Sequence, residues 1–154
     1  MTDQAQSQMG PFSVERIYVR DISFEAPAVP AIFNEAKDKS DLSVQLGIRH
    51  RLVNEATNLH EVVLEITAKA LNGDKTIFLV EVQQAGLFAL PPMTGDVLQR
   101  VLEIECPHVL LPFARETINE LAGKGGFPQL LITPINFAAL YAQKQASKEK
   151  QSVQ

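Results

Sequence analysis

Four segments of the chain alternate between apolar and polar residues with the two-residue period of a β-strand. The clearest is 42–52, where apolar residues occupy all even positions except 50 and polar residues occupy most of the odd positions. Strands are also predicted over 12–25, 61–71 and 75–84. The even positions of the last three strands form one apolar face. An antiparallel sheet that packs this face and exposes the other is therefore predicted.

The sequence Asn72-Gly73-Asp74 between two of these strands is a hairpin signal. A three-residue turn at 72–74 would place Leu64 opposite Val82 and keep the apolar residues on one face, so this register is predicted. The same register places Glu65 opposite Glu81. Like charges in that position are unfavourable, and a cationic partner would relieve them.

The odd face of the predicted sheet also carries apolar residues, which are Val63, Leu71, Ile77 and Leu79. Two interpretations stay open. The face is either a binding surface or a solvated face with scattered apolar residues, which is common in soluble proteins.

The last third of the chain follows the period of helices. Residues 97–105 predict a helix that Pro107 and Pro112 interrupt and that resumes over 113–122. Residues 135–142 predict a short last helix. Four antiparallel strands followed by a broken long helix and a short C-terminal helix define an α+β fold.

The length of 154 residues fits one domain. We expect a disordered N-terminal tail at 1–11, a folded domain at 12–142 and a flexible polar C-terminal tail at 143–154. The tail holds three Lys and one Glu, so the remainder is more acidic than the net charge of −4 suggests.

Composition excludes several classes of protein. An acidic chain is a poor nucleic-acid binder. No apolar run is long enough for a membrane span, and residues 1–11 lack the features of a secretory signal. A single cysteine excludes a disulfide scaffold and a cysteine-built zinc site. Together these features predict a cytoplasmic protein without direct membrane insertion.

No catalytic constellation is present in the sequence. His50, His60 and His108 lie on separate predicted elements, without the spacing of a metal site. Cys106 follows the acidic Glu105, whereas a reactive thiolate usually has a cationic environment. A buried or interface cysteine is therefore predicted. The glycine-rich segment 123–126 follows a helix instead of opening one, so it predicts a helix stop and a flexible loop. We expect no enzyme activity and no cofactor.

The helical region has more apolar residues than one short sheet can cover. They are Leu98, Val101, Leu102, Ile104, Val109, Leu110, Leu111, Phe113, Ile118 and Leu121. Either another chain covers some of them or a groove stays open. Both possibilities indicate an assembly or a binding protein.

A series of motifs spans roughly residues 12 to 141. In order, they are RIY at 16–18, DISFEAP at 21–27, FLVEVQQ at 78–84 with Gly86 and Phe88, Cys106-Pro107, LPFARE at 111–116, GFPQL at 126–130, and PINF at 134–137 with Leu140. Together they resemble the SecB protein-export chaperone family, and 12–142 is interpreted as a SecB-like chaperone domain.

The resemblance implies a homotetramer, built as a dimer of dimers with helices at the dimer–dimer interface. It implies binding of unfolded precursor proteins in apolar grooves and their delivery to the SecA ATPase. The basic, zinc-bearing C-terminal segment of SecA would dock on an acidic sheet surface. The positions that match this surface are Asp21, Glu25, Leu79 and Glu81. The zinc belongs to SecA, so no cofactor is implied for this chain.

A client groove is predicted from the most regular strand and the last helix. Its residues are Leu42, Val44 and Leu46 with Phe137, Leu140 and Tyr141. Phe33 joins them, because many members of the family place a Trp in the same connection. Many members also end in an acidic tail, whereas this chain ends in a lysine-containing one. Two alternatives remain: a small ligand-binding enzyme, and a SecB-like chaperone dedicated to one toxin–antitoxin client.

Overall fold

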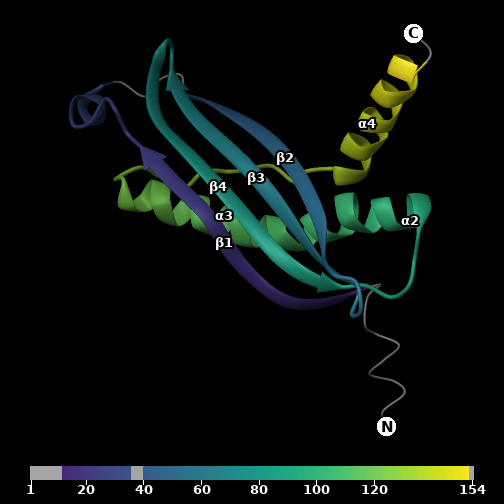
Figure 1. The fold of residues 1–154 in the computed structure, drawn as a ribbon. Coiled ribbons are helices and arrows are strands. Elements are labelled where there is room, and N and C mark those ends of the chain that lie inside the picture. Colours follow the sequence, from purple (N-terminus) through teal and green to yellow (C-terminus); the bar gives the residue numbers. More distant parts are fainter. Residues whose placement is uncertain (1–11, 36–39, 153–154) are drawn as a thin grey trace.

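The computed structural model describes residues 12–35 and 40–152, so the tail predicted at 1–11 lies outside the described residues. Four strands are followed by helices, which confirms the predicted α+β fold (Figure 1). The elements in chain order are β1 (Ser13–Glu25), the 3₁₀ turn η1 (Ala31–Asn34), β2 (Ser40–Asn54), β3 (Leu59–Asn72), β4 (Lys75–Ala89), α2 (Gly95–Arg100), the π-helical segment η2 (Val101–Glu105), α3 (Cys106–Lys124) and α4 (Phe137–Ser152).

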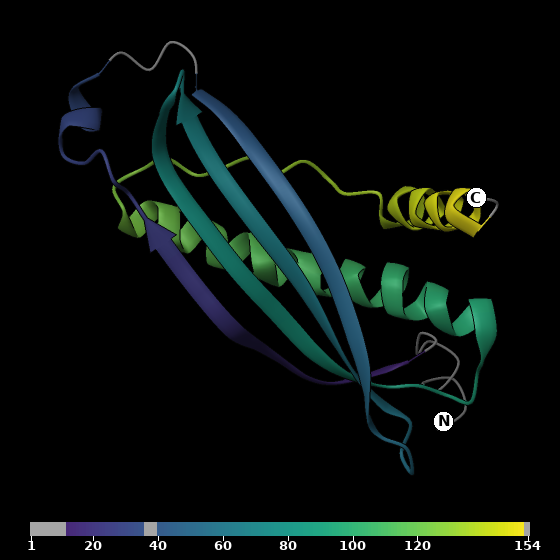
Figure 2. The same cartoon turned by 45° about the horizontal axis from the view of Figure 1, so that its top comes forward.

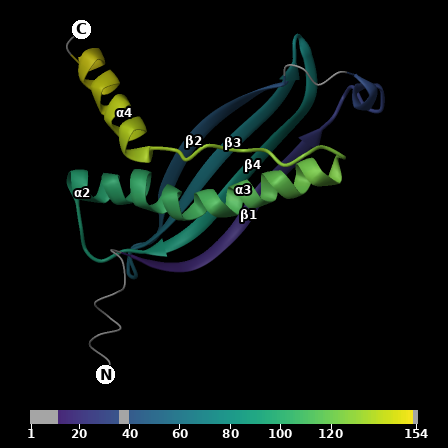
Figure 3. The same cartoon turned by 180° about the vertical axis from the view of Figure 1, so that it is seen from behind.

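The strands form one antiparallel sheet in the order β1-β4-β3-β2, which leaves β1 and β2 at the edges. Helix α3 lies across one face and packs mainly on β4 and β3 (Figures 1 and 3). The even positions of the two central strands point into this layer, as the alternation predicts. The largest fully buried side chains include Leu64, Ile66 and Phe88 of the sheet and Leu110 and Ile118 of α3.

The β3–β4 register differs from the predicted one. Asn72 pairs with Lys75, so the turn has two residues, and Gly73 adopts the positive φ of +61° that such a turn needs. A shift next to Ala70 then returns the even residues to the helix side, where Leu64 lies opposite Gln84 instead of Val82. The predicted three-residue turn was wrong, and the predicted partners on β4 were displaced by two residues. Apolar alternation defines which face a residue occupies, but it does not define the residue's partner on the next strand.

The corrected register removes the predicted charge clash. Glu65 lies opposite Gln83, and Glu81 lies opposite Thr67. The two carboxylates are therefore diagonal and not direct cross-strand neighbours.

Helix α3 continues from α2 through η2 without a break in the chain's helical path (Figure 3). The π-helical segment directly precedes α3, and Pro107 lies in the first turn of α3, where a proline loses little. The interruption predicted at Pro112 does not occur. Pro112 forfeits one backbone hydrogen bond, and its buried neighbours Leu111 and Ala114 keep the helix packed on the sheet.

The glycine-rich segment after α3 makes a close contact with the sheet layer. A Cβ on Gly125 would lie 2.4 Å from the ζ carbon of Phe24, so any larger residue there would require the Phe24 ring to move. Gly126 has a φ of +86° and lies against Phe33. The segment 127–136 then runs back along the helix side of the sheet to α4 (Figures 2 and 3). Helix α4 ends at Ser152, well past the predicted end at Ala142, so 143–152 is helical.

Candidate functional site

The four residues matched to SecA docking lie on one face of the sheet. Glu25 is opposite Leu79 and Ser23 is opposite Glu81, while Asp21 continues the same face of β1. Cross-strand partners share a face, so all four side chains are on the face away from α3. The three carboxylates are exposed and Leu79 is half-buried. We call Asp21, Glu25, Leu79 and Glu81 the acidic sheet surface.

The sequence left open whether Asp21 and Glu25 of β1 lie on the same face of the sheet as Leu79 and Glu81 of β4. A bulge in β1 between Val19 and Asp21 decides it. Before the bulge, Ile17 and Val19 point toward the helix layer, and after it the even residues Ile22 and Phe24 do so. The bulge therefore turns the odd residues of the second half of β1 to the open face.

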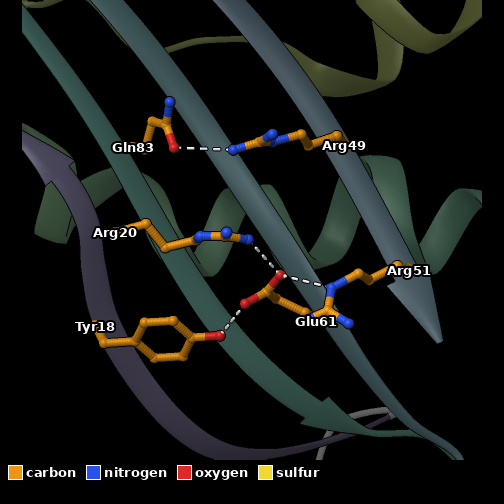
Figure 4. A network of polar contacts seen from close by, with 6 residues as sticks. All are labelled: Tyr18, Arg20, Arg49, Arg51, Glu61 and Gln83. Atoms are coloured by element: carbon orange, nitrogen blue, oxygen red, sulfur yellow. Dashed lines mark hydrogen bonds and ion pairs between the residues drawn. The ribbon is translucent and has the colours of Figure 1, made fainter. Parts of the chain in front are cut away.

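A network of polar side chains crosses the open face next to the acidic sheet surface (Figure 4). At its centre, the Glu61 side chain is only 6% exposed. The Tyr18 hydroxyl donates a hydrogen bond to Oε2 of Glu61. Arg20 Nη1 and Arg51 Nε donate to Oε1 at 2.9 Å and 3.1 Å. Tyr18 and Arg20 of β1 reach across β4 to Glu61 of β3, and Arg51 reaches it from β2, so the network ties both edge strands to the sheet interior.

The network shifts the pKa values of its central groups. Burial alone would raise the pKa of Glu61, but hydrogen bonds from Tyr18 and Arg51 and the charges of Arg20 and Arg51 outweigh it and hold this pKa below the usual 4.5. Burial and the adjacent Glu61 carboxylate raise the pKa of Tyr18 to about 12. Glu61 is therefore ionised and Tyr18 protonated near neutral pH.

Sequence reasoning missed this network. Arg49, on the same face of β2, donates from Nη2 to Oε1 of Gln83 at 2.8 Å. The open face thus has a basic region beside its acidic one. Alternating arginines at 49 and 51 were a visible signal, but the strand order that brings Tyr18 and Arg20 to Glu61 is not readable from the chain.

The opposite face of the sheet is only partly covered, and its open part is along β2. A cavity of about 520 Å³ lies between Val44, Leu46 and Ile48 of β2 and the helix α4. A second cavity of about 390 Å³ continues it toward Leu42. Residues of the connecting segment line this second cavity, namely Leu131, Ile132, Thr133 and Ile135. We call the two cavities together the β2 groove.

The predicted groove residues separate into three places. Leu42, Val44, Leu46 and Leu140 line the β2 groove. Phe137 and Tyr141 do not line it, and both are buried, at 3% and 4% exposure. Tyr141 donates its hydroxyl hydrogen to Oδ1 of Asp96 at 2.6 Å. These two residues therefore anchor α4 instead of contacting a groove ligand.

Phe33 lies in a separate pocket beyond the connecting segment. Its ring is 5.4 Å from that of Phe127, which is 5.0 Å from that of Phe78. Leu130 and Ile77 complete the apolar lining of this pocket. Phe33 is 44% exposed, so the pocket offers an aromatic surface to solvent at the end of the sheet distant from α4.

The other polar candidates have structural surroundings. Cys106 is fully buried, as predicted, and burial together with Glu105 raises its thiol pKa to about 12. Nε2 of His60 lies 3.0 Å from Oδ1 of Asn58. Over residues 12–35 and 40–152, no three His, Cys, Asp or Glu side chains gather as a metal site would need. None of the described helices has the length and apolar character needed to cross a membrane.

Comparison with known protein families shows to which family this chain belongs. Residues 4–148 match the model of the family described as preprotein translocase subunit SecB. The chain belongs to the SecB family. SecB proteins are protein-export chaperones and not enzymes, which excludes the alternative of a small ligand-binding enzyme.

Individual SecB proteins are similar over nearly their whole length. The protein-export protein SecB of Nitrosococcus oceani is 46% identical over 145 residues, which cover 94% of this chain and 87% of that protein. The SecB of Halorhodospira halophila is 45% identical over 139 residues, covering 90% and 79%.

A solved structure shares the fold at much lower identity. It is a Mycobacterium tuberculosis SecB-like chaperone in complex with a peptide from the HigA1 antitoxin. It aligns with a TM-score of 0.69 at 12% identity, over 86% of this chain and 95% of that chain. The likeness establishes a common SecB-type fold.

Glu61→Gln should lower the free energy of unfolding by about 1–3 kcal/mol at pH 7, because the variant loses charge-assisted hydrogen bonds to Arg20 and Arg51. The folded pKa of Glu61 is depressed, so its stabilisation is complete above about pH 4.5 and is lost as the pH falls through the lower folded value. Urea denaturation at pH 7 and pH 3 should show the gap between wild type and variant closing on acidification.

Glu65→Gln is the matched control, since Glu65 is exposed on the same face of β3. It should change stability by less than about 0.5 kcal/mol. A Glu61→Gln variant as stable as this control at pH 7 would contradict a stabilising role for the network.

Proposed function

We propose that this chain binds unfolded precursor proteins, keeps them competent for translocation and delivers them to SecA. The observation that carries the proposal is the separation of two surfaces by the thickness of the sheet. The β2 groove lies on the helix side. The acidic sheet surface lies on the open side. Two opposed surfaces allow a client and a motor protein to be held at once.

The β2 groove suits an extended apolar segment. Its floor is built from even residues of β2, and Val44 is 36% exposed although it is on the core side of the sheet. Unfolded chains offer continuous apolar side chains, which folded proteins bury. The apolar lining therefore favours unfolded over native protein. Repeated grooves in one assembly would raise the avidity for long clients.

The acidic sheet surface suits a basic segment such as the one the SecB resemblance assigns to SecA. Asp21, Glu25 and Glu81 are exposed around the half-buried Leu79, so charge surrounds a small apolar anchor. Exposed charge pairs contribute only about 0–1 kcal/mol each. Several together steer association and make it salt-sensitive.

We further propose a homotetramer in the cytoplasm. The helical layer leaves apolar side chains uncovered on its outer side, with Val97 at 61% and Phe113 at 43% exposure. Helices at a dimer–dimer interface would cover them. The close identity to export proteins of other organisms favours general export over a chaperone dedicated to one toxin–antitoxin client.

Val44→Asp should weaken binding of an unfolded, fluorescently labelled precursor by about tenfold or more, because it places a charge on the apolar floor of the groove. Gln45→Asp, on the opposite face of the same strand, is the control and should bind normally. Fluorescence anisotropy measures both. Equal affinity of the wild-type protein for a native protein and its unfolded form would contradict the client proposal.

Glu81→Lys should weaken binding of purified SecA by about 3- to 10-fold at low salt, since repulsion replaces attraction, and the loss should shrink near 0.5 M salt. Binding of the unfolded precursor should stay near normal. Glu55→Lys is the matched control, because it makes the same charge change in the exposed turn between β2 and β3. It should leave SecA binding near normal. Unchanged SecA affinity at low salt, or loss of precursor binding, would refute the two-surface arrangement.

Phe113→Asp should shift the protein from tetramer to smaller species in sedimentation velocity at micromolar concentration, because a charge cannot be buried unpaired in an interface. Leu131→Asp is the control, since Leu131 is 92% exposed but lies on the connecting segment. A wild-type protein that sediments only as a monomer would rule out the assembly.

A further inference from the structure

Positive charge gathers at one end of the open face of the sheet. Its exposed arginines are Arg16, Arg20, Arg49 and Arg51. Arg16 belongs to this face because its partner on β4, Leu87, is opposite Glu61 on β3. Figure 4 shows the other three arginines around Glu61 and Gln83. The four guanidinium groups and the carboxylate of Glu61 together carry a net charge of +3.

A small cavity opens among these side chains. Its volume is about 90 Å³, and its lining includes Arg20, Arg49, Arg51 and Glu61. We call it the arginine cavity. One water molecule occupies about 30 Å³ in the liquid, so the cavity has room for a carboxylate group but not for a large ligand.

The arginines of the cavity keep hydrogen-bond donors for a ligand. Arg20 and Arg51 each donate one hydrogen bond to Oε1 of Glu61. Arg49 donates one to Oε1 of the uncharged Gln83 and has no ion pair with any described residue. A guanidinium group has five N–H donors. Glu61 therefore uses only part of the donor capacity and balances only one of the positive charges.

The open face is thus divided into two ends of opposite charge. The arginine cavity and the acidic sheet surface meet at one row of the sheet, in which Gln83 is opposite Asp21 on one side and Glu65 on the other. Arg16 and Glu25 are nine residues apart on β1, which corresponds to at most about 30 Å along the strand. A segment of roughly ten extended residues therefore spans both ends.

A divided surface complements a partner segment that is divided in the same way. Basic residues of such a segment lie on the acidic sheet surface, and a carboxylate close to them in sequence enters the arginine cavity. Hydrogen bonds between arginine and a carboxylate are directional and often bidentate. The second contact therefore fixes the direction in which the segment lies. The arginines also repel a purely basic segment that moves away from the acidic sheet surface.

We propose that the arginine cavity is a second docking site for SecA, which receives an aspartate or glutamate carboxylate from an acidic stretch near the basic segment that binds the acidic sheet surface. This inference rests on the proposed function, because it adds a contact to the same docking face. Arg49 is the principal contact residue, since Arg20 and Arg51 also hold Glu61.

Arg49→Glu separates this site from simple attraction between an acidic face and a basic partner. If the arginines had no docking role, the added negative charge would strengthen binding of SecA at low salt. A carboxylate site predicts the opposite, which is binding of purified SecA weakened by about 3- to 10-fold. The loss should shrink near 0.5 M salt. Isothermal titration calorimetry with the full-length proteins measures the affinities.

Two further variants accompany this measurement. Arg49→Gln removes the charge without reversing it and should weaken SecA binding by about 2- to 3-fold. Lys124→Glu is the charge-matched control, because Lys124 is exposed at the end of α3, on the helix side of the sheet. It should leave SecA binding near normal.

Two labelled peptides make the same test without the rest of SecA. Both begin with a block of lysines and a neutral spacer, and one ends in aspartates whereas the other ends in asparagines. The Asp peptide should bind Arg49→Glu about 3- to 10-fold more weakly than wild type. The Asn peptide should bind this variant at least as tightly as wild type. Each peptide is compared with itself, so attraction between its own blocks cancels.

The outcomes separate this inference from the function on which it rests. If Arg49→Glu binds SecA at least as tightly as wild type while Glu81→Lys binds it weakly, the carboxylate site is refuted and the docking face stands. If Glu81→Lys has no effect either, the docking face itself is overturned. An Asp peptide that binds wild type and Arg49→Glu equally also refutes the site.

A folding defect is recognised by a second readout. If Arg49→Glu loses binding of the unfolded precursor as well as of SecA, its loss is general, and Arg49→Gln decides the question. Unchanged SecA affinity of Arg49→Gln then refutes the carboxylate site, and weakened affinity with normal precursor binding supports it.

Discussion

One helix of 19 residues cannot cover both faces, or even one whole face, of a sheet whose strands are 13 to 15 residues long. Helix α3 packs on β4 and β3 and leaves β2 to the connecting segment and α4 (Figure 3). Incomplete coverage by this helical layer therefore produces both surfaces of interest. Even residues of β2 become the floor of a groove, and the opposite face of the sheet is left without a helical layer.

The open face needs its own source of order because no second layer covers it. Glu61 supplies it by accepting hydrogen bonds from Tyr18, Arg20 and Arg51. A buried carboxylate without these partners would be costly, whereas here its pKa is lowered and it joins three strands. The carboxylate of Glu61 also neutralises part of the positive charge of Arg20 and Arg51. The exposed carboxylates of the acidic sheet surface lie beside this ordered network.

Helix α4 combines anchoring and groove formation on adjoining sides of one element. Tyr141 attaches it to α2 through Asp96, and Phe137 contacts His108 of α3, so both influence the groove without lining it. Leu140 and the lysines beyond it form the groove wall. Changes to Asp96 or Tyr141 would therefore reach the groove through the position of α4 and not through a direct contact with a client.

The sequence by itself determined the α+β class, the four strands, the apolar even face, and the burial of Cys106, because these follow from short-range alternation and helical period. It also contained the SecB motifs. Tertiary structure alone decided the β3–β4 pairing, since a two-residue turn and a compensating shift preserve the same alternation as the predicted register. It also decided that Asp21 and Glu81 share a face, through a bulge in β1. Finally, it separated Leu140 from Tyr141, because only packing of α4 on η2 and α2 selects which helical face meets the groove.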